Sequence, residues 1–208
     1  MARLPFRWNP RAQRYIAPTG RFVSQKAVRK ALDDALENAG KEIRRLADDL
    51  RAGRISLAEW QRGMRDALKA RYTYSSAIAK GGWQQMSPSD WGRVGAEVRK
   101  QLGYLRNFAK EIEEGAQPLD GRFVRRAEMY VEASRSFYED TRKRERQSRG
   151  FDEARRVLGI ADHCEGCVDE ASKGWVPIDE VAPIGSQECR TNCRCSIEYR
   201  NSKTGEIG

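Results

Sequence analysis

The chain has 208 residues, of which 39% are hydrophobic and 33% are charged, so the sequence predicts one helical domain with a lean core and a small appendage. No apolar run approaches the roughly 20 residues that a membrane-spanning helix requires, and we expect no membrane partner. The net charge of +9 is uneven, because residues 159–208 carry nine acidic and five basic side chains and residues 1–158 carry a net +13.

The segment 1–23 is aromatic, basic and too short to fold alone. Pro18 and Gly20 favour a tight turn, so we expect an extended arm that contains a short hairpin. Its aromatic side chains either pack onto the chain's own helices or dock on a neighbouring subunit. Both interpretations concern the same residues, namely Trp8, Tyr15 and Phe22.

Four antiparallel helices are predicted in the segment 24–158, which we expect to form an elongated helical body. The first begins at Ser24, and the second begins at Ser56, where Ser56 and Glu59 have the spacing of a capping box. The third begins at Pro88, a residue favoured at the first helical position, and the fourth begins near Arg122.

Each helix has apolar residues at spacings of three and four. This pattern is much more typical of a protein core than of a cofactor site, even where it includes Trp and Met. The clearest positions are Val28, Leu32, Ile43, Leu50, Trp60, Met64, Leu68, Tyr72, Ile78, Val94, Val98, Leu105, Phe108, Phe123, Ala127 and Val131.

The fourth helix is expected to end in the most basic stretch of the chain. One interpretation is a solvated helix end, where positive charge interacts favourably with the helix dipole. The other is a binding surface for nucleic acid or for an acidic partner protein. The candidate binding residues are Arg142, Lys143, Arg144, Arg146 and Arg149.

The segment 159–208 is expected to be a small α+β module, preceded by a short helix over 151–158. Two short strands are predicted over 175–178 and 196–199, with Pro177 confining the first to a sheet edge. We expect Trp175 to cover the metal core of the module that its cysteines predict, and the tail after Asn201 to fray.

All five cysteines lie in this module, in the order C-x2-C, 21 residues, C-x3-C-x-C. Two such clusters can complete a tetrahedral shell of thiolates around zinc, and the metal-ligand candidates are Cys164, Cys167, Cys189, Cys193 and Cys195. Disulfides and reactive thiols are the alternatives. The stretch 1–14 has no apolar segment typical of a secretory signal, so we expect a reducing compartment, which favours structural zinc.

Catalysis is not expected. The single histidine, His163, adjoins Cys164, and adjacent residues rarely face each other across an active site, so a Cys-His pair or a histidine nuclease lacks its base. We expect His163 to lie on the surface or beside the ligands. Glycine-rich phosphate-binding loops are absent from the sequence.

The motif Asp-His-Cys-Glu-Gly-Cys over 162–167, followed by Gly174, Pro183 and Asn-Cys-Arg-Cys-Ser-Ile over 192–197, resembles the C-terminal signature of phage head morphogenesis proteins, the Mu F-like minor capsid family. That family typically ends in His-Pro-Asn-Cys-Arg-Cys. Here Arg190 stands at the histidine position, and Cys189 is the candidate replacement ligand.

The resemblance implies a structural protein, a minor head component that is bound to portal or capsid proteins in multiple copies. Its expected location is the virion head, and the host cytoplasm during assembly, with packaged DNA as a further partner. The alternative is a zinc-containing nucleic-acid-binding or regulatory protein that uses its basic helical body. A weaker third interpretation is an enzyme with its chemistry in the cysteine module.

Overall fold

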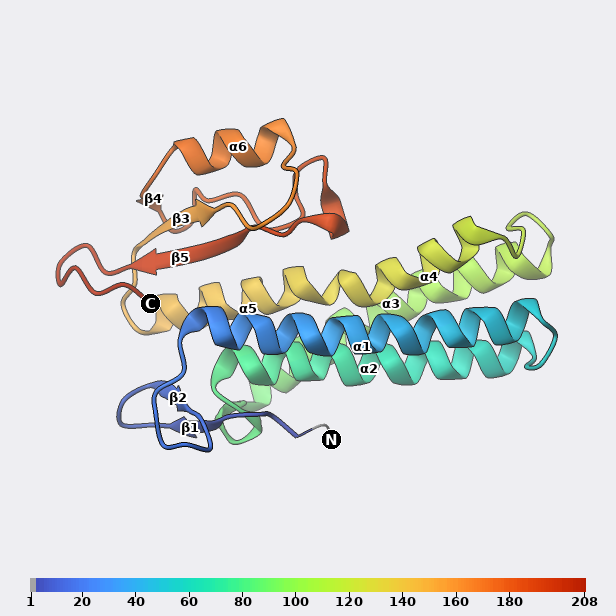
Figure 1. Ribbon diagram of the computed structural model, residues 1–208, viewed down its shortest axis with the longest axis horizontal. Helices are drawn as coiled ribbons and strands as arrows, with labels where there is room; N and C mark the ends of the chain where they lie inside the picture. The colour runs from blue at the N-terminus through green and yellow to red at the C-terminus, as the bar shows by residue number, and fades with distance from the viewer. Residues whose placement is uncertain (1–2) are drawn as a thin grey trace. The chain divides into compact units, whose positions relative to one another are not determined.

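The structure is a computed structural model that describes residues 3–208 (Figure 1). It is mainly helical, with helix over 57% of the chain and a small amount of sheet. The chain divides into two compact units, one up to Ser134 and one from Arg135 to Gly208. The elements of the first unit are β1 Arg7–Asn9, β2 Arg14–Ile16, α1 Gln25–Arg51, α2 Leu57–Lys80, η1 Trp83–Gln85, α3 Pro88–Glu113 and α4 Gly121–Glu132.

The second unit begins within α5, and its sheet has three strands in the order β4-β3-β5. Its elements are α5 Ser134–Ser148, β3 Glu153–Val157, α6 Glu165–Ser172, β4 Val176–Pro177, η2 Arg190–Asn192 and β5 Ser196–Arg200. Among residues 3–208, no helix combines the length and the apolar character needed to cross a membrane.

Local signals in the sequence set the starts of α2 and α3. Ser56 Oγ accepts a hydrogen bond from the backbone N–H of Glu59, whose carboxylate in turn accepts from the N–H of Ser56. Ser87 and Asp90 make the same reciprocal pair at the start of α3, where Pro88 is the first helical residue. Both predicted starts are therefore confirmed, because each cap satisfies backbone donors that the first helical turn leaves unpaired.

The predicted apolar stripes form the core of the first unit. Helix α1 packs against α2 and α4, and α2 also packs against α3. Trp60 is fully buried at the centre, with its ring centroid 5.3 Å from that of Phe108 and 5.4 Å from that of Phe123. The three rings come from α2, α3 and α4, so these helices meet at Trp60. Tilted and edge-on ring pairs of this kind bury large apolar surfaces.

The N-terminal arm packs onto the chain's own helices. Strands β1 and β2 form an antiparallel hairpin in which Trp8 lies opposite Tyr15. The Tyr15 hydroxyl donates to the carbonyl of Ile78 at 2.9 Å, and a Cβ on Gly81 would lie 2.5 Å from the Trp8 ring. The interpretation that Trp8 and Tyr15 pack onto the helices is confirmed, whereas Phe22 is half exposed.

The predicted turn at Pro18 and Gly20 is confirmed, with the N–H of Gly20 donating to the carbonyl of Ala17 and an antiparallel bridge between Ile16 and Phe22. Two further backbone hydrogen bonds, from Ala17 to Arg21 and from Val23 to Tyr15, close this second hairpin of the arm, which follows β2. The β1–β2 connection uses Asn9, whose side-chain oxygen accepts from the two backbone N–H groups that follow Pro10.

The expected single fourth helix is two helices, because α4 ends at Glu132 and α5 begins at Ser134. At this break the buried Ser134 hydroxyl donates to the carbonyl of Val131 at 2.7 Å, a side-chain bond of the kind that bends helices. The compact units also divide at a different place from the predicted boundary between residues 158 and 159. The second unit already begins at Arg135, because α5 and β3 belong with the cysteine-rich segment.

The expected helix over 151–158 is strand β3. All five of its residues pair with β5, from Glu153 opposite Arg200 to Val157 opposite Ser196. Its buried positions alternate, and one of them is an arginine, Arg156, so the sequence lacks the apolar alternation by which a strand is recognised. The predicted strands β4 and β5 are confirmed, with Pro177 on an edge strand.

The tail does not fray. After β5 it turns at Asn201, and the last residue exchanges two backbone hydrogen bonds with Tyr199, of 3.3 and 2.9 Å. Asp152 accepts hydrogen bonds from both the N–H and the hydroxyl of Ser202, which holds the turn. The tail thereby covers the free edge of β5, which would otherwise expose unpaired backbone groups.

Candidate metal centre

The first pair of cysteines lies at the start of α6. Cys164 is the residue that precedes the helix, and the N–H of Cys167 donates to its carbonyl at 3.0 Å. A spacing of three residues across a helix start places both side chains on one side of the turn. The C-x2-C motif therefore presents two sulfur atoms toward the same point.

The second group surrounds the short helix η2. Cys189 precedes this helix, Cys193 follows it, and Cys195 lies just before β5. The turn is tight, because the N–H of Asn192 donates to the carbonyl of Cys189 and Arg190 has a positive φ of 45°. This turn brings three sulfurs of the second group toward α6.

The structure brings all five predicted cysteines together. The Sγ atoms of Cys164, Cys167 and Cys189 lie within 4.8 Å of one another, as do those of Cys167, Cys193 and Cys195. Cys167 belongs to both groups and its sulfur is 3.6 Å from that of Cys189 and 3.9 Å from that of Cys193. The cluster could hold a metal ion.

The two sulfur–sulfur distances from Cys167 fit the edges of a tetrahedral sulfur site. A tetrahedral site with metal–sulfur bonds of about 2.3 Å has edges of about 3.8 Å between sulfurs. The two distances from Cys167 bracket this value. Cys167, Cys193 and Cys195 are buried, which keeps water away from the sulfurs, and the chain holds them as free thiols and not as disulfides.

An arginine that the sequence did not reveal lies against the cluster. Arg156 of β3 is 3% exposed, and its Nη1 atom lies 3.9 Å from the sulfurs of both Cys167 and Cys193. Its Nη2 atom donates to the carbonyls of Ala182 and Pro183. A fixed positive charge at this position would compensate the negative charge of thiolates if the cluster held a divalent cation.

Burial controls the acidity of these thiols. It raises the pKa of Cys189 to about 12, and it raises the pKa values of Cys167 and Cys195 as well. Burial acts in the same direction on Cys193, but hydrogen bonds from the Cys195 backbone and from neighbouring thiols outweigh it and lower that pKa. A metal ion would therefore have to displace protons from at least three of the thiols as it binds.

His163 lies beside the cluster, as expected. Its Nε2 atom is 2.9 Å from the carbonyl oxygen of Gly159, and its Nδ1 atom is 3.6 Å from the sulfur of Cys195. An Nε2–H that donates to Gly159 leaves Nδ1 as an acceptor facing the thiol. The histidine does not belong to either group of close ligand atoms, so it orients Cys195 rather than completing a set.

Trp175 does not cover the cysteines. It lies between Arg155 and Arg200, with each guanidinium carbon 4.7 Å from the ring centroid. Arg155 and Arg156 are consecutive in β3 and point to opposite faces of the sheet, and Arg156 is on the cysteine side. The expectation for Trp175 is therefore wrong.

The basic stretch of α5 does not form one exposed surface. Arg142 and Arg146 are buried, at 3% and 6% exposed. Arg142 donates to the carbonyl of Ile197 and lies over the ring of Tyr199, so it packs inside the second unit. The other three are partly exposed and form ion pairs, Lys143 with Asp179, Arg144 with Asp140, and Arg149 with Glu145.

No protein-family model, curated protein or solved structure matches the chain.

Proposed function

We propose that this chain is a structural protein of a bacteriophage head, a minor component that joins the portal or inner capsid during assembly. The observation that supports this best is the meeting of the two halves of the cysteine motif. The C-x2-C pair and the Asn-Cys-Arg-Cys segment are separated by 24 residues in the sequence, and the sulfurs of Cys167 and Cys193 lie 3.9 Å apart. The motif on which the family resemblance rests is thus one spatial unit.

We propose further that the cluster binds one structural zinc ion. Cysteine-rich sites with tetrahedral spacing favour zinc, and a shell of four thiolates leaves no position for a reactive water. Zinc in such small modules contributes on the order of 10 kcal/mol of apparent binding free energy. The ion would hold α6 against the turn that precedes β5, in a unit whose sheet has only three strands.

In this proposal the first unit is an antiparallel helical bundle that provides the docking body, and the chain has no catalytic role. The lone histidine supports this, because both of its ring nitrogens already have neighbours in the module. Assembly takes place in the host cytoplasm, and the mature location is the virion head. Multiple copies are expected, as for a component that lines a symmetric vertex.

Metal content tests the zinc part of the proposal. Elemental mass spectrometry on untagged protein should find one zinc per chain, and thiol titration should find one reactive thiol before chelation and five after. A chelator should unfold the unit from Arg135 onward and leave the helices of the first unit intact. Protein with no metal and few titratable thiols would contain disulfides, and the zinc site would be refuted.

Composition of the particle tests the head role separately. The chain should be present in purified virions, and particles made without it should be defective in head assembly. Complementation with the Cys167→Ser variant should restore fewer intact heads than wild-type protein, and Ser172→Ala, on the exposed end of α6, serves as the control. Absence of the chain from purified virions would contradict the proposal.

A further inference from the structure

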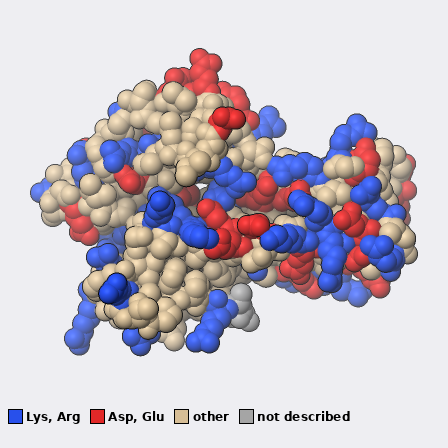
Figure 2. All heavy atoms as spheres, viewed as in Figure 1, with Lys and Arg blue, Asp and Glu red and all other residues tan. Residues whose placement is uncertain are grey.

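The N-terminal arm is a strongly positive surface with no compensating carboxylates. Residues 1–32 contain eight basic side chains and no acidic one. Within residues 3–208, the arm's arginines form no ion pair, and all of them are exposed. They are Arg3, Arg7, Arg11, Arg14 and Arg21. Figure 2 shows blue atoms and no red ones over the hairpin region on the face in view.

The hairpin places the side chains of Arg7 and Arg14 on the same face of the two strands. Arg7 lies opposite Ile16 and Arg14 opposite Asn9, whereas Trp8 pairs with Tyr15. Directly opposite residues share a face, so the arginines project away from the helices that Trp8 and Tyr15 contact. The guanidinium of Arg14 also lies 4.7 Å from the ring centroid of the half-exposed Phe22. The outer face therefore offers cations beside an aromatic ring.

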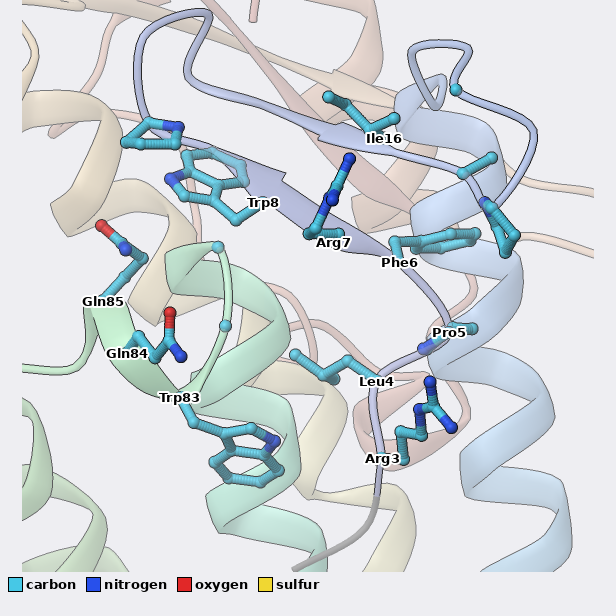
Figure 3. A pocket seen from close by; sticks show the side chains of 16 residues that line it. Arg3, Leu4, Pro5, Phe6, Arg7, Trp8, Ile16, Trp83, Gln84 and Gln85 are labelled. Carbon is cyan, nitrogen blue, oxygen red and sulfur yellow. The ribbon is translucent and has the colours of Figure 1, made fainter.

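A pocket of about 1020 Å³ adjoins this face, between the arm and the segment from Gly81 to Gln85. Its lining has three aromatic side chains and two amides, and Figure 3 shows Trp83, Gln84 and Gln85 on one side with Arg7 and Phe6 on the other. None of the lining residues is acidic. The volume is at the upper end of the range for small-molecule sites, about 300–1,000 Å³.

We propose that the arm and this pocket bind single-stranded nucleic acid, with phosphates on the arm arginines and an unpaired base in the pocket. Unpaired arginines beside aromatic rings and hydrogen-bonding amides are the features that bind a strand whose bases are free to stack. A duplex would use the cations but leave the aromatic lining without a role. Arginine and aromatic residues are also enriched at protein interfaces, so the test below includes an acidic polypeptide as a competitor.

The inference goes beyond the proposed head role and does not depend on the metal centre. A head protein that fails to bind a strand would still be found in particles, and a strand-binding protein that is absent from particles would contradict only the structural role. The two proposals therefore fail by different measurements.

The test uses the full chain and a fluorescent oligothymidylate, with binding followed by anisotropy over a series of salt concentrations. Arg7→Gln combined with Arg14→Gln should reduce the slope of log K against log salt by about 1.4, since each lost phosphate contact on a single strand contributes about 0.7. The control combines Arg99→Gln with Arg106→Gln, two exposed arginines of α3, which change the net charge equally. If both double variants reduced the salt slope equally, the proposed binding site on the arm would be wrong.

The pocket is tested by Trp83→Leu, which keeps an apolar side chain but removes the flat ring. We expect at least about fivefold weaker binding of the oligothymidylate, since stacking of one base contributes 1–3 kcal/mol. Trp91→Leu, at the 37% exposed Trp91 outside the pocket, is the control. Circular dichroism verifies that both variants fold. A duplex bound as tightly as the single strand, or polyglutamate that competes equally well, would overturn the proposal.

Discussion

The Nη1 atom of Arg156 lies 3.9 Å from the sulfur of Cys167, which is the cysteine shared by both groups of candidate ligands. The two residues come from different elements, β3 and α6. A buried guanidinium needs negative partners, and the two backbone carbonyls that it also contacts carry only partial charge. The charge of Arg156 already acts on the buried carboxylate of Glu170 and helps to lower its pKa. The thiolates of a metal-loaded cluster would add negative charge beside the guanidinium, so the arginine and the cluster would favour each other's charged states.

Replacing this arginine should weaken metal binding. Arg156→Gln removes the charge beside the sulfurs, and we expect an affinity loss of about 10- to 100-fold, as for other residues that contact metal ligands. Competition with a chromophoric chelator measures the affinity, and the thiolate-to-metal absorption of the cobalt-substituted protein should shift. Both readouts concern the metal shell and not the fold alone.

Arg155→Gln is the matched control, because Arg155 is the neighbouring residue of β3, points to the other face and pairs with Glu198 at 2.8 Å. It changes the net charge of the unit by the same amount. If both variants lost metal affinity equally, the effect would be one of general charge, and the role assigned to Arg156 would be wrong.

The sequence predicted the parts of the fold that depend on local chemistry. The starts at Ser56 and Pro88 were predictable because a capping residue acts on backbone groups within its own turn. The buried face of α2 that contains Trp60 was predictable because apolar residues spaced by three and four lie on one side of a helix. The cysteine cluster was predictable because its spacing is typical of metal sites, although the ion and its ligands stay predictions.

Two of the differences from the predictions share one physical cause, which is charge at buried positions. Arg156 occupies an inward position of β3, so hydropathy could not identify the strand. Arg142 belongs to a basic run that is typical of a solvated helix end, yet it is buried against the rings of Tyr138 and Tyr199. Such burial depends on partners from distant segments, and no local pattern in the sequence encodes those partners.

The aromatic centre of the first unit should dominate its stability. Trp60→Ala removes a fully buried ring that contacts Phe108 and Phe123, and we expect the free energy of unfolding to fall by about 3–5 kcal/mol. Trp60→Phe should be milder, because it keeps an aromatic ring and removes a buried indole N–H that has no hydrogen-bond partner within residues 3–208. Urea unfolding followed by circular dichroism measures both.

Trp91→Ala is the control for this comparison, since Trp91 is 37% exposed on α3. Exposed substitutions usually change stability by no more than about 0.5 kcal/mol. A loss at Trp91 comparable to that at Trp60 would mean that the core is not centred on α2, α3 and α4 as described.

The contact between the arm and the end of α2 should depend on Gly81. This residue has a φ of +98°, and an added Cβ would lie 2.5 Å from the Trp8 ring. Gly81→Ala should therefore combine backbone strain with displacement of Trp8, and the hairpin should become susceptible to limited proteolysis. Gly53→Ala shares the positive φ, at +68°, but its Cβ would meet nothing within 4 Å, so it should lower stability and leave the hairpin protected. Protection of the hairpin in both variants would contradict the packing of Trp8 on Gly81.

The cap of α3 should give the first unit a pH dependence in the acidic range. Burial favours the neutral form of Asp90, but hydrogen bonds from the backbone and hydroxyl of Ser87 and the charge of Lys80 outweigh it and lower the pKa below its usual value of 3.8. Because the pKa is lower in the folded state, the carboxylate stabilises the fold fully at pH values above 3.8, and this contribution is lost as the pH falls through the folded-state pKa.

Asp90→Asn should consequently lower the free energy of unfolding at neutral pH, and its difference from wild type should shrink as the pH falls below about 4. Ser87→Ala, which should cost about 1 kcal/mol as a lost cap, removes the hydroxyl that donates to the carboxylate and keeps the backbone N–H donor. In a double-mutant cycle, Asp90→Asn should then cost less in the Ser87→Ala background than in wild type. A pH-independent cost of Asp90→Asn, or equal costs in the two backgrounds, would show that the carboxylate does not stabilise α3 through this cap.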